Sequence, residues 1–234
     1  MTGPTSAPEK PTRTEYIAEH RKLLALRDKS NVDFKLAMAE DDLASAEQCV
    51  SELNLAKESF SAFRSKLTAR ELFILKYNIT TGDPSGHEVQ LELPKGVSRA
   101  QFLLEAQALG VGGQNAVWPA QLTKWLNDEA FKSGESKITK LRIDGNVAGS
   151  TDKTRELQED FLTKKGVAMP SLEDLAVAHV AFFILAGNDL FQGNVVRARG
   201  WALNFDADGL SVSDWLDAYR YDLIAAAAVL SPRN

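Results

Sequence analysis

Residues 170–186 read PSLEDLAVAHVAFFILA, and this stretch decides the fold. Apolar residues leave almost no polar face between Leu172 and Leu185, which predicts a helix buried at the centre of a core. Ser171 has the side-chain oxygen of an N-cap residue, and Asp174 stands three residues later, as in a capping box. We expect this helix to run to about Ala186, with the rest of an α+β domain packed around it.

Three short segments after this helix are predicted strands. They cover residues 195–199, 201–205 and 209–212. The second and third are separated by Asp206-Ala207-Asp208-Gly209, and Asp-Gly is a strong signal for a hairpin turn. The same four residues begin like a calcium loop, but the third oxygen ligand, the glycine at position six and the distal glutamate are missing. We therefore interpret them as a turn and expect no metal.

The segment after these strands mixes aromatic and polar residues before a small-apolar run at 223–230. Rigid amphipathic rings contribute contact area at low entropic cost, and carboxylates and hydroxyls supply hydrogen bonds. The sequence therefore predicts a ligand- or protein-binding surface at about residues 195–230; the alternative is that the rings belong to a core. The candidate residues are Asp206, Asp208, Ser211, Ser213, Asp214, Trp215, Asp217, Tyr219, Tyr221 and Asp222.

The order of short motifs in this region resembles a known family. Gly193-Asn194-Val195, the run RARGWAL at 197–203, Tyr219-Arg220 and the closing small-apolar run are arranged in that order. This order resembles the C-terminal end of the formylglycine-generating-enzyme-like C-type lectin fold. The resemblance covers about residues 190–230, and the chain departs from it where RGWA at 199–202 stands in place of RGGS and where the closing GFR is absent.

The resemblance implies a C-type-lectin-like fold for this part of the chain. The variable proteins of diversity-generating retroelements use that fold, and their ligand surface lies on residues scattered near the C-terminus. The chain has no lysine after Lys165 and no glutamate after Glu173, which suits a surface built from a restricted set of codons. The two catalytic cysteines of enzymes with this fold have no counterpart, so their oxidase activity is not implied.

A long helical arm is predicted from about residue 14 to 68, after a flexible tail at 1–13 that contains three prolines. Apolar residues recur every seven positions, with others four positions after the first three, which is the spacing of a coiled-coil seam. These residues are Val32, Ala39, Ala46, Leu53, Phe60 and Leu67, joined by Leu36, Leu43 and Val50. The seam can close within the chain as a hairpin, with Ser30-Asn31 as the candidate turn, or between chains in a homo-oligomer. An amphipathic helix packed on the following domain is the alternative.

The stretch from 70 to 168 is predicted to alternate strands and helices. Residues 72–79 are a strand candidate, although their first part can instead prolong the helix. Residues 88–93 alternate as a second strand of the same hairpin. Further elements are a helix capped by Ser98, a short helix carrying Leu122, Trp125 and Leu126, a strand ending near Asp144, and an outer helix capped by Ser150 or Thr151 and reaching about Lys165.

Composition restricts the class of protein. The 234 residues are 44% hydrophobic and 25% charged, as in ordinary soluble proteins, and the net charge of −5 argues against a general nucleic-acid binder. A single cysteine, Cys49, excludes an intrachain disulfide. No apolar run has the roughly 18 residues of a membrane span, and residues 1–13 do not resemble a secretory signal. The expectation is a cytoplasmic protein without a membrane span.

No catalytic or metal motif is present. His20, His87 and His179 stand apart, and no HExxH or CxxC pairing occurs. We expect His179 to be a hydrogen-bonded core residue and Cys49 a small buried one. The glycines at 110, 112 and 113 lack the spacing of a phosphate loop and are interpreted as a linker. The sequence therefore predicts a non-enzymatic binding protein without a cofactor; the alternative is a structural or assembly protein that oligomerises through its helical arm.

Overall fold

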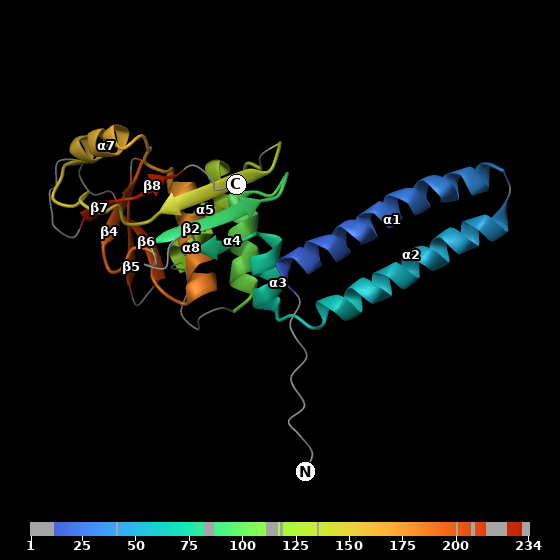
Figure 1. Ribbon diagram of the computed structural model, residues 1–234. Coiled ribbons are helices and arrows are strands. Elements are labelled where there is room, and N and C mark those ends of the chain that lie inside the picture. Colours follow the sequence, from blue (N-terminus) through green and yellow to red (C-terminus); the bar gives the residue numbers. More distant parts are fainter. Residues whose placement is uncertain are drawn as a thin grey trace, which may run out of the picture. The chain divides into compact units, whose positions relative to one another are not determined.

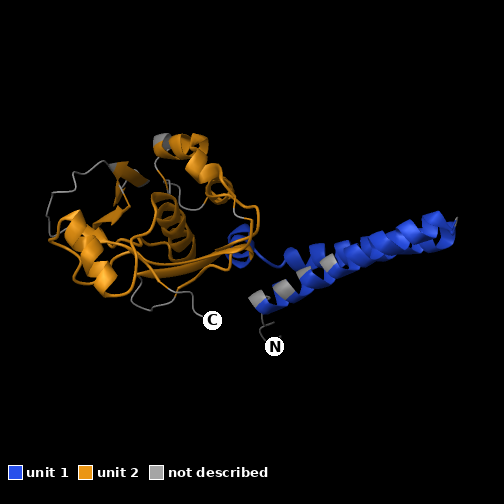
Figure 2. Cartoon of the chain, turned by 90° about the horizontal axis from the view of Figure 1, so that it is seen from above, with its two compact units in different colours: residues 1–75 blue, residues 76–234 orange. Residues whose placement is uncertain are grey.

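The computed structural model describes residues 12–40, 42–81, 87–110, 117, 119–134, 136–199, 201–206, 209–213 and 224–230. The chain contains both helices and sheets, as the predicted α+β class requires. It divides into two compact units, residues 1–75 and 76–234, coloured separately in Figure 2.

The first unit contains two long helices, α1 (Arg13–Ala39) and α2 (Leu43–Arg64), that pair as a hairpin (Figure 1). The sequence left open a continuous helix and a hairpin that turns at Ser30-Asn31, and the structure has a hairpin. The chain turns at Glu40 to Asp42, not at Ser30-Asn31, although no glycine or proline marks the place. The reason lies in the caps: the Asp42 carboxylate accepts a hydrogen bond from the Ser45 amide at 3.1 Å, while the Asp42 amide donates back to the Ala37 carbonyl at 2.8 Å.

The contact between α1 and α2 follows alternating steps of three and four residues. The positions are Tyr16, Glu19, Leu23, Leu26, Ser30, Asp33 and Ala37 on α1, and Ala46, Cys49, Leu53, Ala56, Phe60 and Phe63 on α2. Each is buried or half-buried, whereas the other described side chains of these two helices are exposed. The seam predicted from the sequence is thus correct for α2 from Ala46 to Phe60. It is wrong for Val32, Leu36, Ala39, Leu43 and Val50, which are exposed because the turn changes which side of each helix faces its neighbour.

The second unit begins around a four-stranded antiparallel sheet. Its strands are β1 (Thr80–Thr81), β2 (Glu88–Leu93), β3 (Thr139–Asp144) and β8 (Ala228–Val229), in the order β1-β2-β3-β8. The strand predicted at 72–79 is wrong: residues 72–76 belong to α3 (Ala69–Lys76), and the strand that pairs with β2 is β1, which begins only at Thr80. Thr68 caps this helix, because its hydroxyl accepts a hydrogen bond from the Glu71 amide at 3.2 Å while its own amide donates to the Glu71 carboxylate at 2.8 Å.

A second four-stranded sheet follows the central helix. Its strands are β4 (Val195–Ala198), β5 (Trp201–Asp206), β6 (Gly209–Ser213) and β7 (Ile224–Ala226), in the order β6-β5-β4-β7. Asp206 pairs with Gly209, which confirms the predicted hairpin between the second and third segments. Strands β7 and β8 are separated by Ala227 alone, so one short run supplies a strand to each sheet.

The predicted central helix is confirmed as α8 (Leu172–Ala186). The Ser171 hydroxyl accepts a hydrogen bond from the Asp174 amide at 3.2 Å, and Gly187 ends the helix in the left-handed region at φ 73°. Most of its side chains from Leu175 to Ile184 are fully buried. The helix packs against β2, β3 and α4 (Arg99–Ala108), near the middle of the second unit in Figure 1.

Three further helices cover this unit: α5 (Pro119–Asn127), α6 (Glu129–Lys132) and α7 (Arg155–Lys164). The cap predicted for α7 at Ser150 or Thr151 is wrong, since the hydroxyl of Thr154 caps it. Ser150 is instead buried, and its hydroxyl accepts a hydrogen bond from the Ala226 amide at 2.9 Å. Helix α7 also buries Gln158 completely, so it is more than a solvated outer layer.

Candidate functional site

The predicted recognition residues fall on β5, β6 and the segment after β6. Asp206 is the last residue of β5, and Ser211 and Ser213 belong to β6. The other seven candidates lie outside the described residues; they are Asp208, Asp214, Trp215, Asp217, Tyr219, Tyr221 and Asp222. Sheet geometry therefore places only three of the ten.

The pairing of β5 with β6 shows which of these three positions lie on the same side of the sheet. Ser213 stands opposite Ala202, Ser211 opposite Asn204, and Asp206 opposite Gly209. Residues directly opposite in an antiparallel pair share a face, and alternate residues along a strand do too. The three candidates thus occupy one set of alternate positions in the sheet, together with Asn204 and the buried Ala202.

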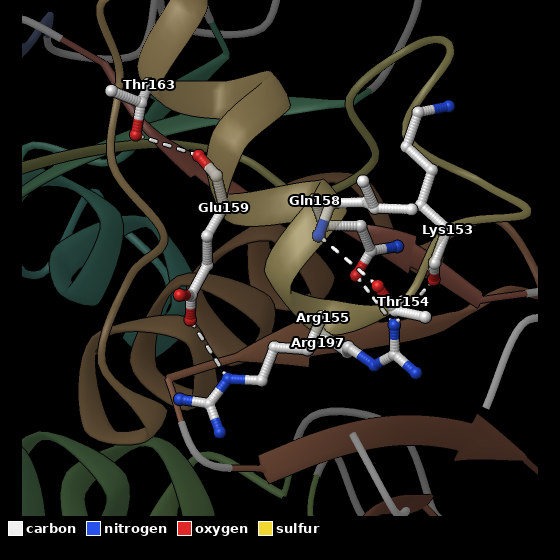
Figure 3. Close-up of polar contacts among 8 residues, drawn as sticks. Lys153, Thr154, Arg155, Gln158, Glu159, Thr163 and Arg197 are labelled. Carbon is white, nitrogen blue, oxygen red and sulfur yellow. Dashed lines mark hydrogen bonds and ion pairs between the residues drawn. The ribbon is translucent and has the colours of Figure 1, made fainter. Parts of the chain in front are cut away.

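On the neighbouring strand β4, Arg197 pairs with Ala202 and therefore belongs to the same set of alternate positions, but it lies in the interior. Arg197 is only 2% exposed, and its Nη1 donates to the Lys153 carbonyl at 2.9 Å and to Gln158 Oε1 at 3.0 Å (Figure 3). Gln158 Nε2 in turn donates to the carbonyls of Ser150 and Ile224. This network ties α7 to β4 and β7 with hydrogen-bond partners from the protein itself, so its chemistry is structural.

His179 is the most unusual polar group in the core. Both ring nitrogens are buried without a hydrogen-bond partner, and the rings of Phe191 and Phe205 lie 4.7 and 4.6 Å away between centroids. Its predicted burial is confirmed, and its predicted hydrogen bonding is wrong. Complete burial lowers the pKa of His179 to about 3, so the imidazole is neutral at physiological pH and a poor general base.

Asp189 is the charged group that faces this histidine, with Oδ1 3.6 Å from His179 Nδ1. Burial raises the pKa of Asp189, while the amides of Phe191 and Gly193 each donate to its carboxylate at 2.7 Å. The carboxylate therefore already accepts hydrogen bonds from two backbone amides. The pair lacks the hydrogen bond that a catalytic histidine and its orienting carboxylate share.

The described part of the chain, residues 12–230 with its gaps, has neither a metal-ion cluster nor a helix able to span a membrane. Among those residues, no group of three histidine, cysteine, aspartate or glutamate side chains could hold a metal ion. The helices described there are too short or too polar to cross a bilayer.

The helical hairpin carries a surface that the sequence did not assign to function. Among the described side chains of α1 and α2, seven large apolar ones are exposed: Val32, Phe34, Leu36, Met38, Leu43, Val50 and Leu55. Single exposed apolar residues are normal, but a group of this size on one element marks an interaction surface. The residues were visible in the sequence, where most were assigned to the seam. The acidic run from Glu40 to Asp42, with Ser45 three residues after Asp42, was the signal for the turn that exposes them.

Part of this surface forms a groove near the turn, which we call the tip groove. Phe34 and Met38 of α1 and Leu43 and Val50 of α2 line it, and Glu47 lies at its side. A second hollow, the middle groove, is lined by Leu23, Leu26, Leu55, Ala56 and Phe60, with Lys22, Lys29 and Glu52 among its polar residues. Both grooves are open and predominantly apolar, which suits a helix of another protein better than a small polar ligand.

Comparisons of this chain with protein-family models, with curated proteins and with solved structures gave no match.

Proposed function

We propose that this chain is a non-enzymatic protein-binding protein and that the α1–α2 hairpin, an antiparallel coiled coil, is its binding arm. The observation that carries the proposal is the exposure of seven large apolar side chains beside a seam that is already filled. The seam holds the hairpin together without them. The exposure of these side chains to water is unfavourable in the isolated chain. Their burial against a partner is favourable.

The size of the apolar surface sets the kind of partner. Full burial of one such side chain contributes about 1.5–3 kcal/mol, so a half-exposed one contributes roughly 1 kcal/mol more when covered. Association itself costs about 4–15 kcal/mol in lost freedom. A partner must therefore cover most of one side of the hairpin, which favours a helix or a helical hairpin over a short peptide.

Site-specific cross-linking in the native cells tests the binding function. A photoreactive phenylalanine analogue is placed at Phe34 or Val50, and in a matched control at Lys35, which is exposed one residue from Phe34 and points away from the groove side. We expect protein adducts at positions 34 and 50 that are absent or much weaker at 35. Equal labelling at all three positions would contradict the proposal.

A second candidate function is ligand recognition by the second sheet. Its support is the register that places Asp206, Ser211 and Ser213 on one set of alternate positions beside Asn204. The resemblance to the formylglycine-generating-enzyme-like C-type lectin fold places a retroelement-diversified ligand surface in the same region. The gene's neighbourhood tests this: a reverse transcriptase gene and a nearby imperfect copy of the last codons, differing at adenines, are expected. If the reverse transcriptase gene and the imperfect copy are both absent, the ligand surface is not diversified by a retroelement.

A further inference from the structure

Charge is distributed unevenly along the hairpin. The tip segment, residues 32–52, has one lysine against six carboxylates, a net charge of −5. The base segments, residues 13–31 and 53–66, have eight lysines and arginines against four carboxylates, a net charge of +4. Because α1 and α2 pair along their lengths, the two base segments lie side by side. The folded hairpin is therefore a rod with an acidic tip and a basic base.

The basic residues continue the side of the hairpin that carries the tip groove. Arg27 precedes Phe34 by seven residues, and Lys57 follows Val50 by seven. Seven residues make about two helical turns, so each pair lies on one side of its helix. Arg27 and Lys57 are both exposed. This side thus changes along its length from apolar and acidic near the turn to a stretch further away that carries Arg27 and Lys57, where Glu58 also lines the tip groove and Asp28 pairs with Arg27 at 2.8 Å.

We propose that the partner of this side is a second copy of the same chain, bound antiparallel, so that the tip of each hairpin lies on the base of the other. The proposal rests on the binding function of the hairpin argued above. A parallel pair would put Arg27 and Lys57 against their own copies, and like charges in register oppose association. The antiparallel pair puts them beside the acidic tip instead.

The lengths of the helices agree with this arrangement. Phe34 lies five residues before the end of α1 and Val50 seven residues after the start of α2, so both are about 8–10 Å from the turn along the helix axis. A two-fold axis at that level packs Phe34 of one copy near Val50 of the other. It also brings Lys57, about 21 Å from the turn, to within roughly 3 Å of the level of the opposite turn. One register therefore satisfies both the apolar and the charged contacts and closes the dimer.

Sedimentation of the full-length chain over a concentration series tests self-association. We expect a reversible dimer. The double variant Phe34→Ser, Val50→Ser should raise the dissociation constant by at least about a hundredfold, since aromatic and aliphatic side chains at a contact centre dominate its energy. The control is Leu104→Ser, Ile138→Ser, which removes two exposed apolar side chains of the second unit, outside the hairpin, and should leave the dimer unchanged. Circular dichroism checks that both variants keep their helices.

Charge reversal tests the pairing of tip with base. The tip variant Glu40→Lys, Glu47→Lys and the base variant Arg27→Glu, Lys57→Glu should each lose roughly tenfold or more in self-association, and an equimolar mixture of the two should recover it. Orientation is read by a bismaleimide cross-linker in a Cys49→Ser background. Chains with Glu47→Cys should link to chains with Lys57→Cys, whereas a parallel dimer would link 47 to 47.

The outcomes separate this proposal from the binding function. A purified chain that stays monomeric at every concentration, or one that links 47 to 47, overturns the antiparallel dimer. If the chain is monomeric and photoreactive groups at 34 and 50 still capture another protein in cells, the hairpin binds protein, and only the identification of its partner as a second copy is wrong. If neither dimer nor adducts form, both proposals fail.

Discussion

Replacing His179 with leucine should make the second unit less sensitive to acid. In the wild-type chain the imidazole is fully buried, has no hydrogen-bond partner and is surrounded by phenylalanine rings. Its pKa falls from the usual 6.5 to about 3 on folding, because burial penalises the charged form. The unfolded chain therefore takes up this proton at a higher pH than the folded chain does.

The sign and size of the effect follow from that difference. A lowered histidine pKa means that the stability is fully present above pH 6.5 and is lost as pH falls toward 3. Each unit of pKa corresponds to about 1.4 kcal/mol, so the wild-type chain should lose about 2 kcal/mol at pH 5 through this residue alone. At pH 3 the loss approaches about 5 kcal/mol.

Urea unfolding followed by tryptophan fluorescence measures this change in the right unit, because all four tryptophans lie between residues 118 and 215. Wild type and His179→Leu are compared at pH 8 and pH 5. Acid effects from carboxyl groups, including Asp189, occur in both chains and cancel in the difference. We expect the free energy of unfolding of the variant, relative to wild type, to rise by about 2 kcal/mol between pH 8 and pH 5.

A constant difference between the two chains would refute the reasoning. It would mean that the folded chain accommodates the imidazolium, and Asp189, 3.6 Å away, is the residue that could do so. The variant His179→Phe gives an independent check, since it also lacks a titrating group but fills more of the space left by the imidazole. It should show the same pH dependence as His179→Leu even if its absolute stability differs.

Three other substitutions test the packing of the second unit, each measured by the urea midpoint. Gln158→Ala should destabilise the fold by about 3 kcal/mol, because it removes one acceptor from the buried guanidinium of Arg197. Glu159→Ala, on the exposed side of the same helix, is the control and should change stability by less than about 0.5 kcal/mol. Equal effects of the two substitutions would contradict the role of the network. Gly145→Ala should destabilise by about 1–3 kcal/mol, since a Cβ there would collide with Leu190, and an unchanged midpoint would show that the contact yields. Phe182→Ala should destabilise by about 3–5 kcal/mol through lost burial and a cavity, and a loss below about 1 kcal/mol would place α8 outside the core.

The sequence predicted the centre of the second unit well because local and global signals agree there. The start signal at Ser171, the stop at Gly187 and the apolar run between them all indicate one buried helix. The β5–β6 hairpin was predictable for the same reason, since Asp-Gly sits between two alternating segments. Where each level of the sequence gives the same answer, the fold can be read without tertiary information.

The helical arm was harder because its turn has no breaking residue. Moving the turn from Ser30-Asn31 to Glu40–Asp42 changes the set of residues that face inward along α1 and at the start of α2. Two sets of residues with seven-residue spacing are candidates for the contact in this stretch. Only the structure of the paired helices shows which set faces inward. Four of the seven exposed apolar residues, Val32, Leu36, Leu43 and Val50, belong to the pattern that the structure rejects, so the surface could not be recognised before the turn was placed.

The polar network of the second unit was beyond sequence reasoning for a different reason. Arg197 and Gln158 are 39 residues apart, and nothing in the spacing of either indicates the other. Whether a glutamine on a helix with a mostly charged surface is completely buried depends on tertiary packing alone. The same is true of Ser150, whose hydroxyl accepts from β7 instead of capping α7.

The run that holds β7 and β8 has a consequence for the order in which the protein assembles itself during synthesis. Residues 224–229 complete both sheets, with a parallel contact to β4 and an antiparallel contact to β3 more than 80 residues earlier. Neither sheet can close until this run has left the ribosome, and such distant pairings form slowly. The hairpin needs only contacts within its own first 64 residues. The arm is therefore folded, and its apolar side available, while the domain behind it is still being made.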